Sequence, residues 1–119
     1  MTPVRAFAGI GSRETPDDIL GLMAAVARML AAQGWTLRSG GAGGADTAFE
    51  LAMPENQREI YLPWATFSGR PGIVISSLPV FAQAEAIAKA HHPASENPAV
   101  WKKIGKLMAR NACQVLGRD

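Results

Sequence analysis

The sequence is short of cysteine, of long apolar runs and of net charge, and each shortage excludes a class of protein. Its one cysteine, Cys113, has no partner for an internal disulfide, so we expect a reducing, cytoplasmic compartment. No apolar stretch approaches the roughly 18 residues of a membrane-spanning helix, and the first residues do not resemble a signal peptide. The formal charge of +2 does not by itself indicate a nucleic-acid binder.

What the sequence does have is glycine, with six of its 12 glycines gathered in two turns. The first turn, Gly-Ile-Gly-Ser-Arg at 9–13, follows a short, mostly apolar stretch, and the second, at 39–46, follows another. Glycine permits positive φ and close approach of a ligand, and a helix that begins after such a turn presents free amide groups. Two such turns on neighbouring parallel strands predict one anion-binding crevice at the carboxyl ends of the strands.

The order of apolar and helical patterns predicts an α/β fold, a Rossmann-like three-layer sandwich with a mostly parallel sheet and helices on both faces. We expect a single domain over 1–119. The expected strands cover 4–10, 35–38 and 58–62, with 72–75 as a candidate edge strand, and the expected helices cover 15–33, 45–53, 79–91 and 99–116.

The first expected helix has clear end signals. Thr15 is the candidate N-cap, Pro16 fits the first helical position, and Gly34 fits the end. One apolar stripe is expected to face the sheet, formed by Ile19, Leu22, Met23, Val26, Met29 and Leu30.

A sheet of three strands would leave an open edge, which is small for this architecture. We therefore expect either a partner over that edge, most simply a second copy in a homodimer, or a further C-terminal segment that is missing here.

The candidate ligand-binding residues belong to the two turns: Gly9, Gly11, Ser12, Arg13, Ser39, Gly40, Gly41, Ala42, Gly43, Gly44 and Asp46. Backbone amides of the second turn are expected to hold a phosphate. The alternative is a tight connection whose glycines serve packing alone. Arg13 either clamps the anion or is a surface arginine that pairs with Glu14 or Asp17. Neither turn is a P-loop or a dinucleotide fingerprint.

Two acidic residues follow the second turn. Asp46 is expected to accept hydrogen bonds from ribose hydroxyls, to cap the helix, or to do both. Glu50 lies one helical turn later, so the pair either tunes the charge of the crevice or supports acid–base chemistry on a glycosidic bond. Glu50 is thus a candidate catalytic residue.

The second half offers weaker candidates. Adjacent His91 and His92 cannot chelate one metal at helical spacing, and we expect no metal site and no required cofactor; a role at the end of a helix suits them better. Trp64 either stacks a base or packs in the core. The basic stretch of the last helix is either a solvated face or a contact for nucleic-acid phosphates, and it consists of Lys102, Lys103, Lys106 and Arg110.

These motifs resemble the SLOG superfamily of Rossmann-like proteins, which includes the DNA-processing protein DprA and the LOG-type phosphoribohydrolases. The resemblance, to a small phage or prokaryotic branch, is carried by 9–13, 37–50, 60–64, His92-Pro93, 109–111 and 114–117. It implies a pocket for a nucleotide at the two turns and adds Arg110 and Asn111 to the ligand-binding set. Members of that branch usually continue into another strand and glycine turn, so the chain is short relative to them.

The expected function is binding of a nucleotide or nucleotide-derived ligand. The alternatives are DprA-like binding of single-stranded DNA and hydrolysis of nucleoside monophosphates. In the segment 43–50, which resembles the phosphoribohydrolase signature, aspartate replaces a glycine, so the resemblance does not transfer a catalytic role to Glu50 and enzymatic activity stays open.

Overall fold

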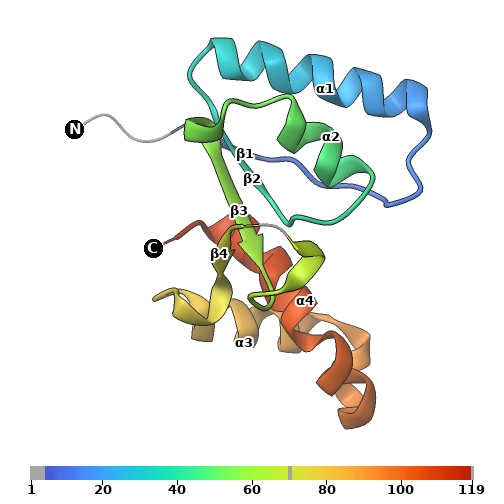
Figure 1. Ribbon diagram of the computed structural model, residues 1–119. Helices are drawn as coiled ribbons and strands as arrows, with labels where there is room; N and C mark the ends of the chain where they lie inside the picture. The colour runs from blue at the N-terminus through green and yellow to red at the C-terminus, as the bar shows by residue number, and fades with distance from the viewer. Residues whose placement is uncertain (1–4, 70, 119) are drawn as a thin grey trace. The chain divides into compact units, whose positions relative to one another are not determined.

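The computed structural model describes residues 5–69 and 71–118 (Figure 1). Four strands form a parallel sheet in the order β1-β2-β3-β4 and alternate with helices. The strands are β1 Ala6–Ala8, β2 Thr36–Ser39, β3 Arg58–Leu62 and β4 Ile73–Val74. The α/β class, the parallel sheet and the Rossmann-like architecture expected from the sequence are confirmed. The candidate edge strand exists as β4, so the sheet has four strands rather than three.

The α-helices are α1 Asp17–Ala32, α2 Ala45–Leu51, α3 Phe81–His91 and α4 Pro98–Leu116. Short 3-10 turns lie at Glu55–Gln57, Phe67–Gly69, Ile75–Ser77 and Pro93–Glu96. The chain divides into two compact parts, 1–60 and 61–119.

In the first part, α1 and α2 pack against each other and on strand β2. Arg38 of β2 and Glu59 of β3 are register partners and form an ion pair with a 3.5 Å separation. The side-chain amide of Gln57 donates to the carbonyl of Ala31 (3.0 Å) and to that of Trp35 (2.9 Å). One side chain therefore holds the turn between α1 and β2.

The start of α1 differs from the expectation. The N-cap position is Pro16, which makes no side-chain capping bond, and the Thr15 hydroxyl donates instead to the carbonyl of Ser12 at 2.7 Å. Thr15 is drawn into the preceding turn, so its hydroxyl is not available to the helix. At the other end Gly34 has φ of 85°, which agrees with its expected role in ending the helix.

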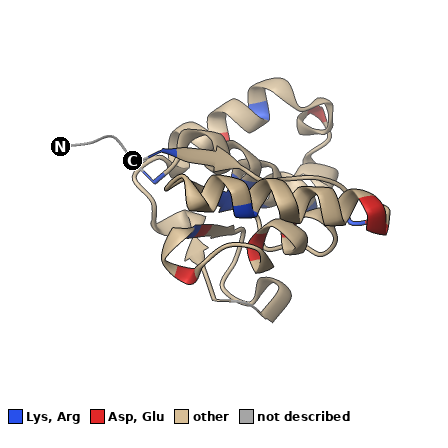
Figure 2. Ribbon diagram, turned by 90° about the horizontal axis from the view of Figure 1, so that it is seen from above, with Lys and Arg blue, Asp and Glu red and all other residues tan. Residues whose placement is uncertain are grey.

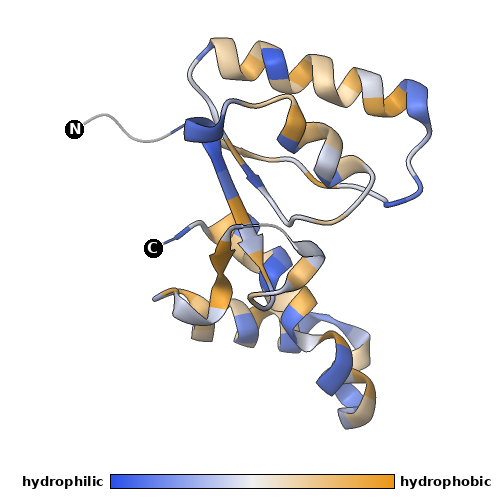
Figure 3. Ribbon diagram, viewed as in Figure 1, coloured by the Kyte–Doolittle hydropathy of each residue, from blue (hydrophilic) through white to orange (hydrophobic). Residues whose placement is uncertain are grey.

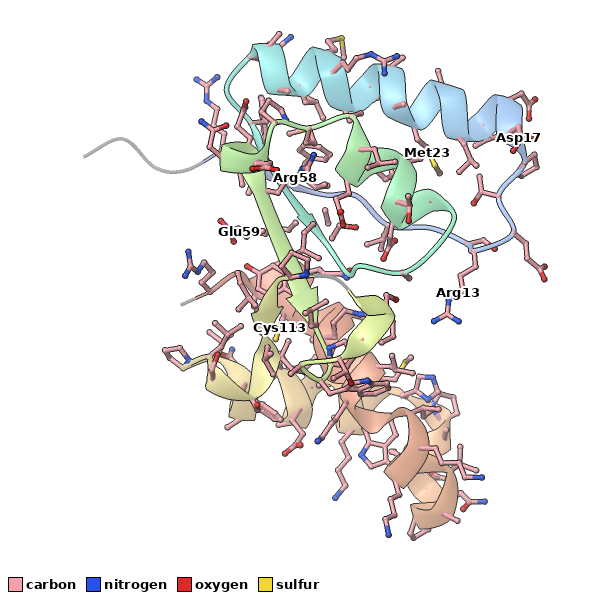
Figure 4. The ribbon with its side chains drawn as sticks, in the orientation of Figure 1. Arg13, Asp17, Met23, Arg58, Glu59 and Cys113 are labelled. Carbon is pink, nitrogen blue, oxygen red and sulfur yellow. The ribbon has the colours of Figure 1, made fainter. Side chains whose placement is uncertain are left out.

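The prediction of the apolar stripe of α1 is also only partly correct. Ala27 is fully buried and Met23 and Leu30 are half-buried, whereas four expected sheet-facing residues are exposed: Ile19, Leu22, Val26 and Met29. Figure 4 shows Met23 on the side of α1 that faces α2. The helix is apolar over more of its circumference than the sheet and α2 cover.

The second part has a core of larger side chains. Tyr61 of β3 packs with Ile75, with Val80 and Ala84 at the start of α3, and with Ala109 and Cys113 of α4. Burial raises the pKa of the Cys113 thiol. The helix α4 has a true side-chain cap, because Asn97 Oδ1 accepts from the amides of Ala99 and Val100.

Candidate functional site

The first glycine turn is built by close backbone packing. The amide of Gly9 donates to the carbonyl of Arg38 at 2.9 Å, which continues the pairing of β1 with β2. A Cβ on Gly9 would lie 2.6 Å from Leu37 Cδ1, and one on Gly11 would lie 2.6 Å from Ala45 Cβ. Packing therefore accounts for both glycines without a ligand.

Ser12 organises this turn through its own polar atoms. Its carbonyl accepts hydrogen bonds from the Thr15 hydroxyl and from the amide of Ala45 (3.1 Å), and its hydroxyl accepts one from the amide of Glu14 (3.0 Å). The hydroxyl proton stays available for a further acceptor.

The second turn is fixed to the first. The hydroxyl of Ser39, which is fully buried, donates to the carbonyl of Gly9 at 2.6 Å. Gly44 has φ of 70°, and a Cβ there would lie 2.6 Å from the carbonyl oxygens of Ser12 and Arg13. The structure thus brings the two glycine turns together, as the sequence predicted, with backbone of one directly against backbone of the other.

Gly43 is the exception among these glycines. It is exposed, its φ lies outside the left-handed region, and a Cβ would meet no heavy atom within 4 Å. By contrast, Gly41 has φ of 72° and needs to be glycine for conformational reasons. Neither packing nor conformation requires glycine at position 43.

The amides of the second turn fall into two groups. Those of Ala42 and Ala45 are used inside the protein, the first by Asp46 Oδ2 at 3.4 Å and the second by Ser12. The amides of Gly41, Gly43 and Gly44 have no acceptor among the residues that the structure describes. Of these three residues Gly41 is buried, so the turn offers the amides of Gly43 and Gly44 rather than the complete set expected from the sequence.

Arg13 is an exposed side chain beside these amides. Within the described residues it forms no ion pair with Glu14 or Asp17. Figure 4 shows its side chain extending from the turn away from the ribbon. Its guanidinium is thus unconstrained by the nearby acids.

Asp46 and Glu50 are both buried on α2, at 5% and 8% exposure. The N-cap of α2 is Gly44, so the expected capping role of Asp46 is wrong; the carboxylate reaches back to Ala42 instead. The Thr47 hydroxyl donates to the carbonyl of Ala42 at 2.8 Å. The side chains of Asp46 and Thr47 therefore brace the turn from its helical side.

Arg110 and Asn111, which the family resemblance placed in the ligand set, belong to the second compact part. Arg110 is 7% exposed, donates from Nε to Asn111 Oδ1 at 3.0 Å, and has its guanidinium carbon 5.4 Å from the centre of the Phe67 ring. A buried arginine held in this way is not part of a solvated basic face.

The remaining candidates have local partners. His92 Nδ1 accepts from the amide of Ala94 and its ring lies 5.9 Å from that of Trp101, so it begins the turn after α3. Trp64 makes an edge contact with Phe67 at 5.4 Å and is still 39% exposed. Lysines 102, 103 and 106 are exposed on α4.

Two hollows in the second part were not foreseen. One, of about 440 Å³, is lined by Ile73, Ser77, Leu78, Pro79 and Arg118. The other, of about 220 Å³, lies between α3 and α4 and is lined by Ile87, Ala88, His91, His92, Met108 and Asn111. No sequence pattern joins residues so far apart in the chain, so no local signal could have found either hollow.

No cluster of three or more potential metal-binding side chains occurs among the described residues. In the same part of the chain, no helix is long and apolar enough to cross a membrane. Comparison with family models, curated proteins and solved structures found no match.

Proposed function

We propose that the chain binds a nucleotide or nucleotide-derived ligand through the phosphate, at the two glycine turns. The observation that carries this proposal is Gly43, a glycine with open space around it in a turn that also presents amides without acceptors in the described chain. A residue without a side chain lets an anion approach the backbone closely, and successive amides in a turn form an anion-binding concavity. The resemblance of both turns to the SLOG superfamily supports the nucleotide as the source of that anion.

In this proposal the amides of Gly43 and Gly44 donate to phosphate oxygens and Arg13 adds a charge-assisted hydrogen bond from the rim. Ser12 donates its hydroxyl proton to the ligand, because its hydroxyl oxygen already accepts a hydrogen bond from the amide of Glu14. Ser39 and Asp46 act indirectly, since one ties the turns together and the other braces Ala42.

The first experiment is a thermal-shift screen of the chain with AMP, ADP-ribose and a short oligothymidine. A ligand at about a hundredfold its dissociation constant adds roughly 2.7 kcal/mol to the free energy of unfolding, which a melting curve detects. Stabilisation by AMP or ADP-ribose is expected. A sharp melt unmoved by both compounds counts against the proposal.

The site itself is tested by titration calorimetry on two matched arginine variants. Arg13→Ala is expected to weaken binding at least tenfold, or about 1.4 kcal/mol, whereas Arg28→Ala, an exposed arginine on α1, is expected to leave it unchanged. Gly43→Ala is expected to weaken binding while the melting temperature without ligand stays constant. Equal affinities in all three variants place the ligand elsewhere.

Single-stranded nucleic acid is the second candidate ligand, favoured by the exposed lysines 102, 103 and 106, which share one face of α4 and have no ion pair within the described residues. Replacing all three by glutamine is expected to lower the salt slope of oligothymidine binding by about 2, while Lys89→Gln on α3 serves as the control. Weak binding that salt does not affect removes this candidate.

Hydrolysis is distinguished from binding in the same samples. A phosphoribohydrolase would add water across the N-glycosidic bond of AMP and release adenine and ribose 5-phosphate. If adenine is released from AMP and Glu50→Gln abolishes this release, the site is catalytic. If AMP stays intact after prolonged incubation, the site only binds the nucleotide.

A further inference from the structure

The smaller hollow of the second compact part has the composition of a ligand site. It lies between α3 and α4, which pack against each other, and its volume is about 220 Å³. Its apolar lining comes from Ile87 and Ala88 of α3 and from Met108 of α4, a helix along which apolar and hydrophilic residues alternate (Figure 3). Small-molecule sites are mostly apolar with a few fixed polar groups. The polar groups of this hollow therefore decide what it can bind.

The first polar group is the imidazole of His92, whose tautomer is fixed by a hydrogen bond. Its Nδ1 accepts from the amide of Ala94 at 3.1 Å, so in the neutral ring the proton is on Nε2. The ring also lies 5.9 Å from that of Trp101, which restricts its orientation. Nε2 is therefore a donor, and no acceptor for it occurs among the described residues.

The second polar group is the side-chain amide of Asn111 on α4. Its Oδ1 accepts from Nε of Arg110 at 3.0 Å, which leaves Nδ2 as the free end of the amide. Nδ2 reaches the sulfur of Met108 at 3.9 Å, and a thioether is a weak acceptor. Since Nδ2 carries two hydrogens, one of them is available to a stronger acceptor. Asn111 thus presents a donor whose orientation a neighbouring residue sets, as His92 does.

Fixed charge is absent from this lining. Figure 2 shows charged residues scattered along the chain, whereas the described residues that line the hollow include no lysine, arginine, aspartate or glutamate. The remaining lining residue, His91, is exposed at the C-terminal end of α3, and this end of a helix disfavours an anion. An ionised ligand would lose its hydration without an opposite charge to replace it. The hollow is therefore suited to a neutral ligand that supplies acceptors.

We infer that this hollow binds a small uncharged ligand whose apolar ring or short chain carries a carbonyl group. The carbonyl oxygen accepts from Nε2 of His92 and from Nδ2 of Asn111, and the apolar body lies on the apolar lining of α3 and α4. Because sites for drug-sized molecules begin at roughly 300 Å³, a hollow of about 220 Å³ limits the body to about one ring. The glycine turns take no part, so this inference is independent of the proposed function.

The first experiment titrates acetophenone, a benzene ring with one carbonyl, into the isotope-labelled full chain and follows the NMR spectrum. A saturable shift of the side-chain amide signal of Asn111 is expected, together with shifts of the backbone signals of Ala88 and Met108. Ethylbenzene lacks the carbonyl and benzoate adds a charge, and each is expected to bind about tenfold more weakly.

Three results of this titration would overturn the inference. Absence of a saturable shift at Asn111 removes the site. Ethylbenzene that binds as tightly as acetophenone shows that the two donors do not select the ligand. Benzoate that binds more tightly than acetophenone shows that the site prefers an anion to an uncharged carbonyl.

Two conservative variants remove the donors and keep the contacts that hold them. Asn111→Asp retains an oxygen for Nε of Arg110, and His92→Asn retains a side-chain acceptor for the amide of Ala94. Each is expected to weaken acetophenone binding about tenfold while the melting temperature stays nearly constant. Wild-type affinity in Asn111→Asp would overturn the inference, whether or not His92→Asn folds.

The apolar lining is tested by a matched pair of truncations. Ile87→Ala shortens a lining residue that is 38% exposed, and it is expected to weaken acetophenone binding several-fold. Val100→Ala shortens a residue of α4 that is 40% exposed and lies outside the lining, and it is expected to leave the affinity unchanged. Equal affinities in these two variants would contradict a ligand seated on the lining of α3.

Discussion

The two halves of this chain reach compactness by different means. In residues 1–60 the closest contacts are made by backbone, at glycines whose missing side chains let one turn lie against another. In residues 61–119 they are made by large buried side chains such as Tyr61 and Ile75 around the thiol of Cys113. The first arrangement leaves amides of the second glycine turn without acceptors among the described residues, whereas the second buries its contacts in a core of side chains.

A large loss of stability is expected from a single methyl group in the first half. Gly44→Ala would place Cβ 2.6 Å from backbone atoms of Ser12 and Arg13, at a positive φ, and we expect the free energy of unfolding to fall by about 3 kcal/mol. Gly43→Ala is the control, with an expected change within about 0.5 kcal/mol. Urea unfolding measures both, and equal losses would show that crowding at Gly44 does not govern this half.

In the second half the sensitive positions should be large side chains. Ile75→Ala removes a fully buried side chain from the core and is expected to cost about 2 to 4 kcal/mol. Leu51→Ala deletes a comparable side chain that is 70% exposed in the first half, and its cost should be small. Similar losses in chemical unfolding would contradict the contrast between the halves.

Helix capping is expected to give a smaller difference in stability between variants of the two halves. Asn97→Ala removes the side-chain cap of α4 and should cost about 1 kcal/mol, whereas α1 has no such cap to lose. Replacing Pro16 by Ser would give α1 a side chain that can cap, and a gain of stability is expected. Thermal melts of the two variants should therefore shift in opposite directions.

The smallest effect concerns Cys113. Burial raises the pKa of the Cys113 thiol, so the folded state favours its neutral form. The contribution of the neutral thiol to the free energy of unfolding is complete at pH values below the ordinary thiol pKa. It is lost as the pH rises through the raised value. We expect slow reaction of the native thiol with a disulfide reagent near neutral pH and fast reaction in urea. Rapid labelling of the native chain would mean that the α4 core opens readily.

Much of the fold was readable from the sequence. The bounds of β3 agree with the prediction, and α4 begins one residue early at a proline after an asparagine cap. These features are local, since a short apolar run or a capping residue needs no distant partner. The contact between the two turns was also foreseen, because parallel strands align their carboxyl ends.

Two of the errors share one physical cause, which is that a side chain had a choice of hydrogen-bond partners. Thr15 could cap a helix or donate a hydrogen bond to the carbonyl of Ser12, and the structure shows the hydrogen bond to Ser12. Asp46 could cap α2 or accept a hydrogen bond from the amide of Ala42, and the structure shows the hydrogen bond to Ala42. For α1 the sequence showed how many apolar residues it has but not which of them the sheet would cover, and that depends on neighbours distant in the sequence.

The double hydrogen bond of Gln57 bears on the order in which the chain assembles. The loop between α1 and β2 is held by an amide that lies 22 and 26 positions further along the sequence. During synthesis from the N-terminus, the helix and the second strand leave the ribosome before the residue that fastens them. The first half therefore gains its final rigidity late, when the beginning of the third strand arrives.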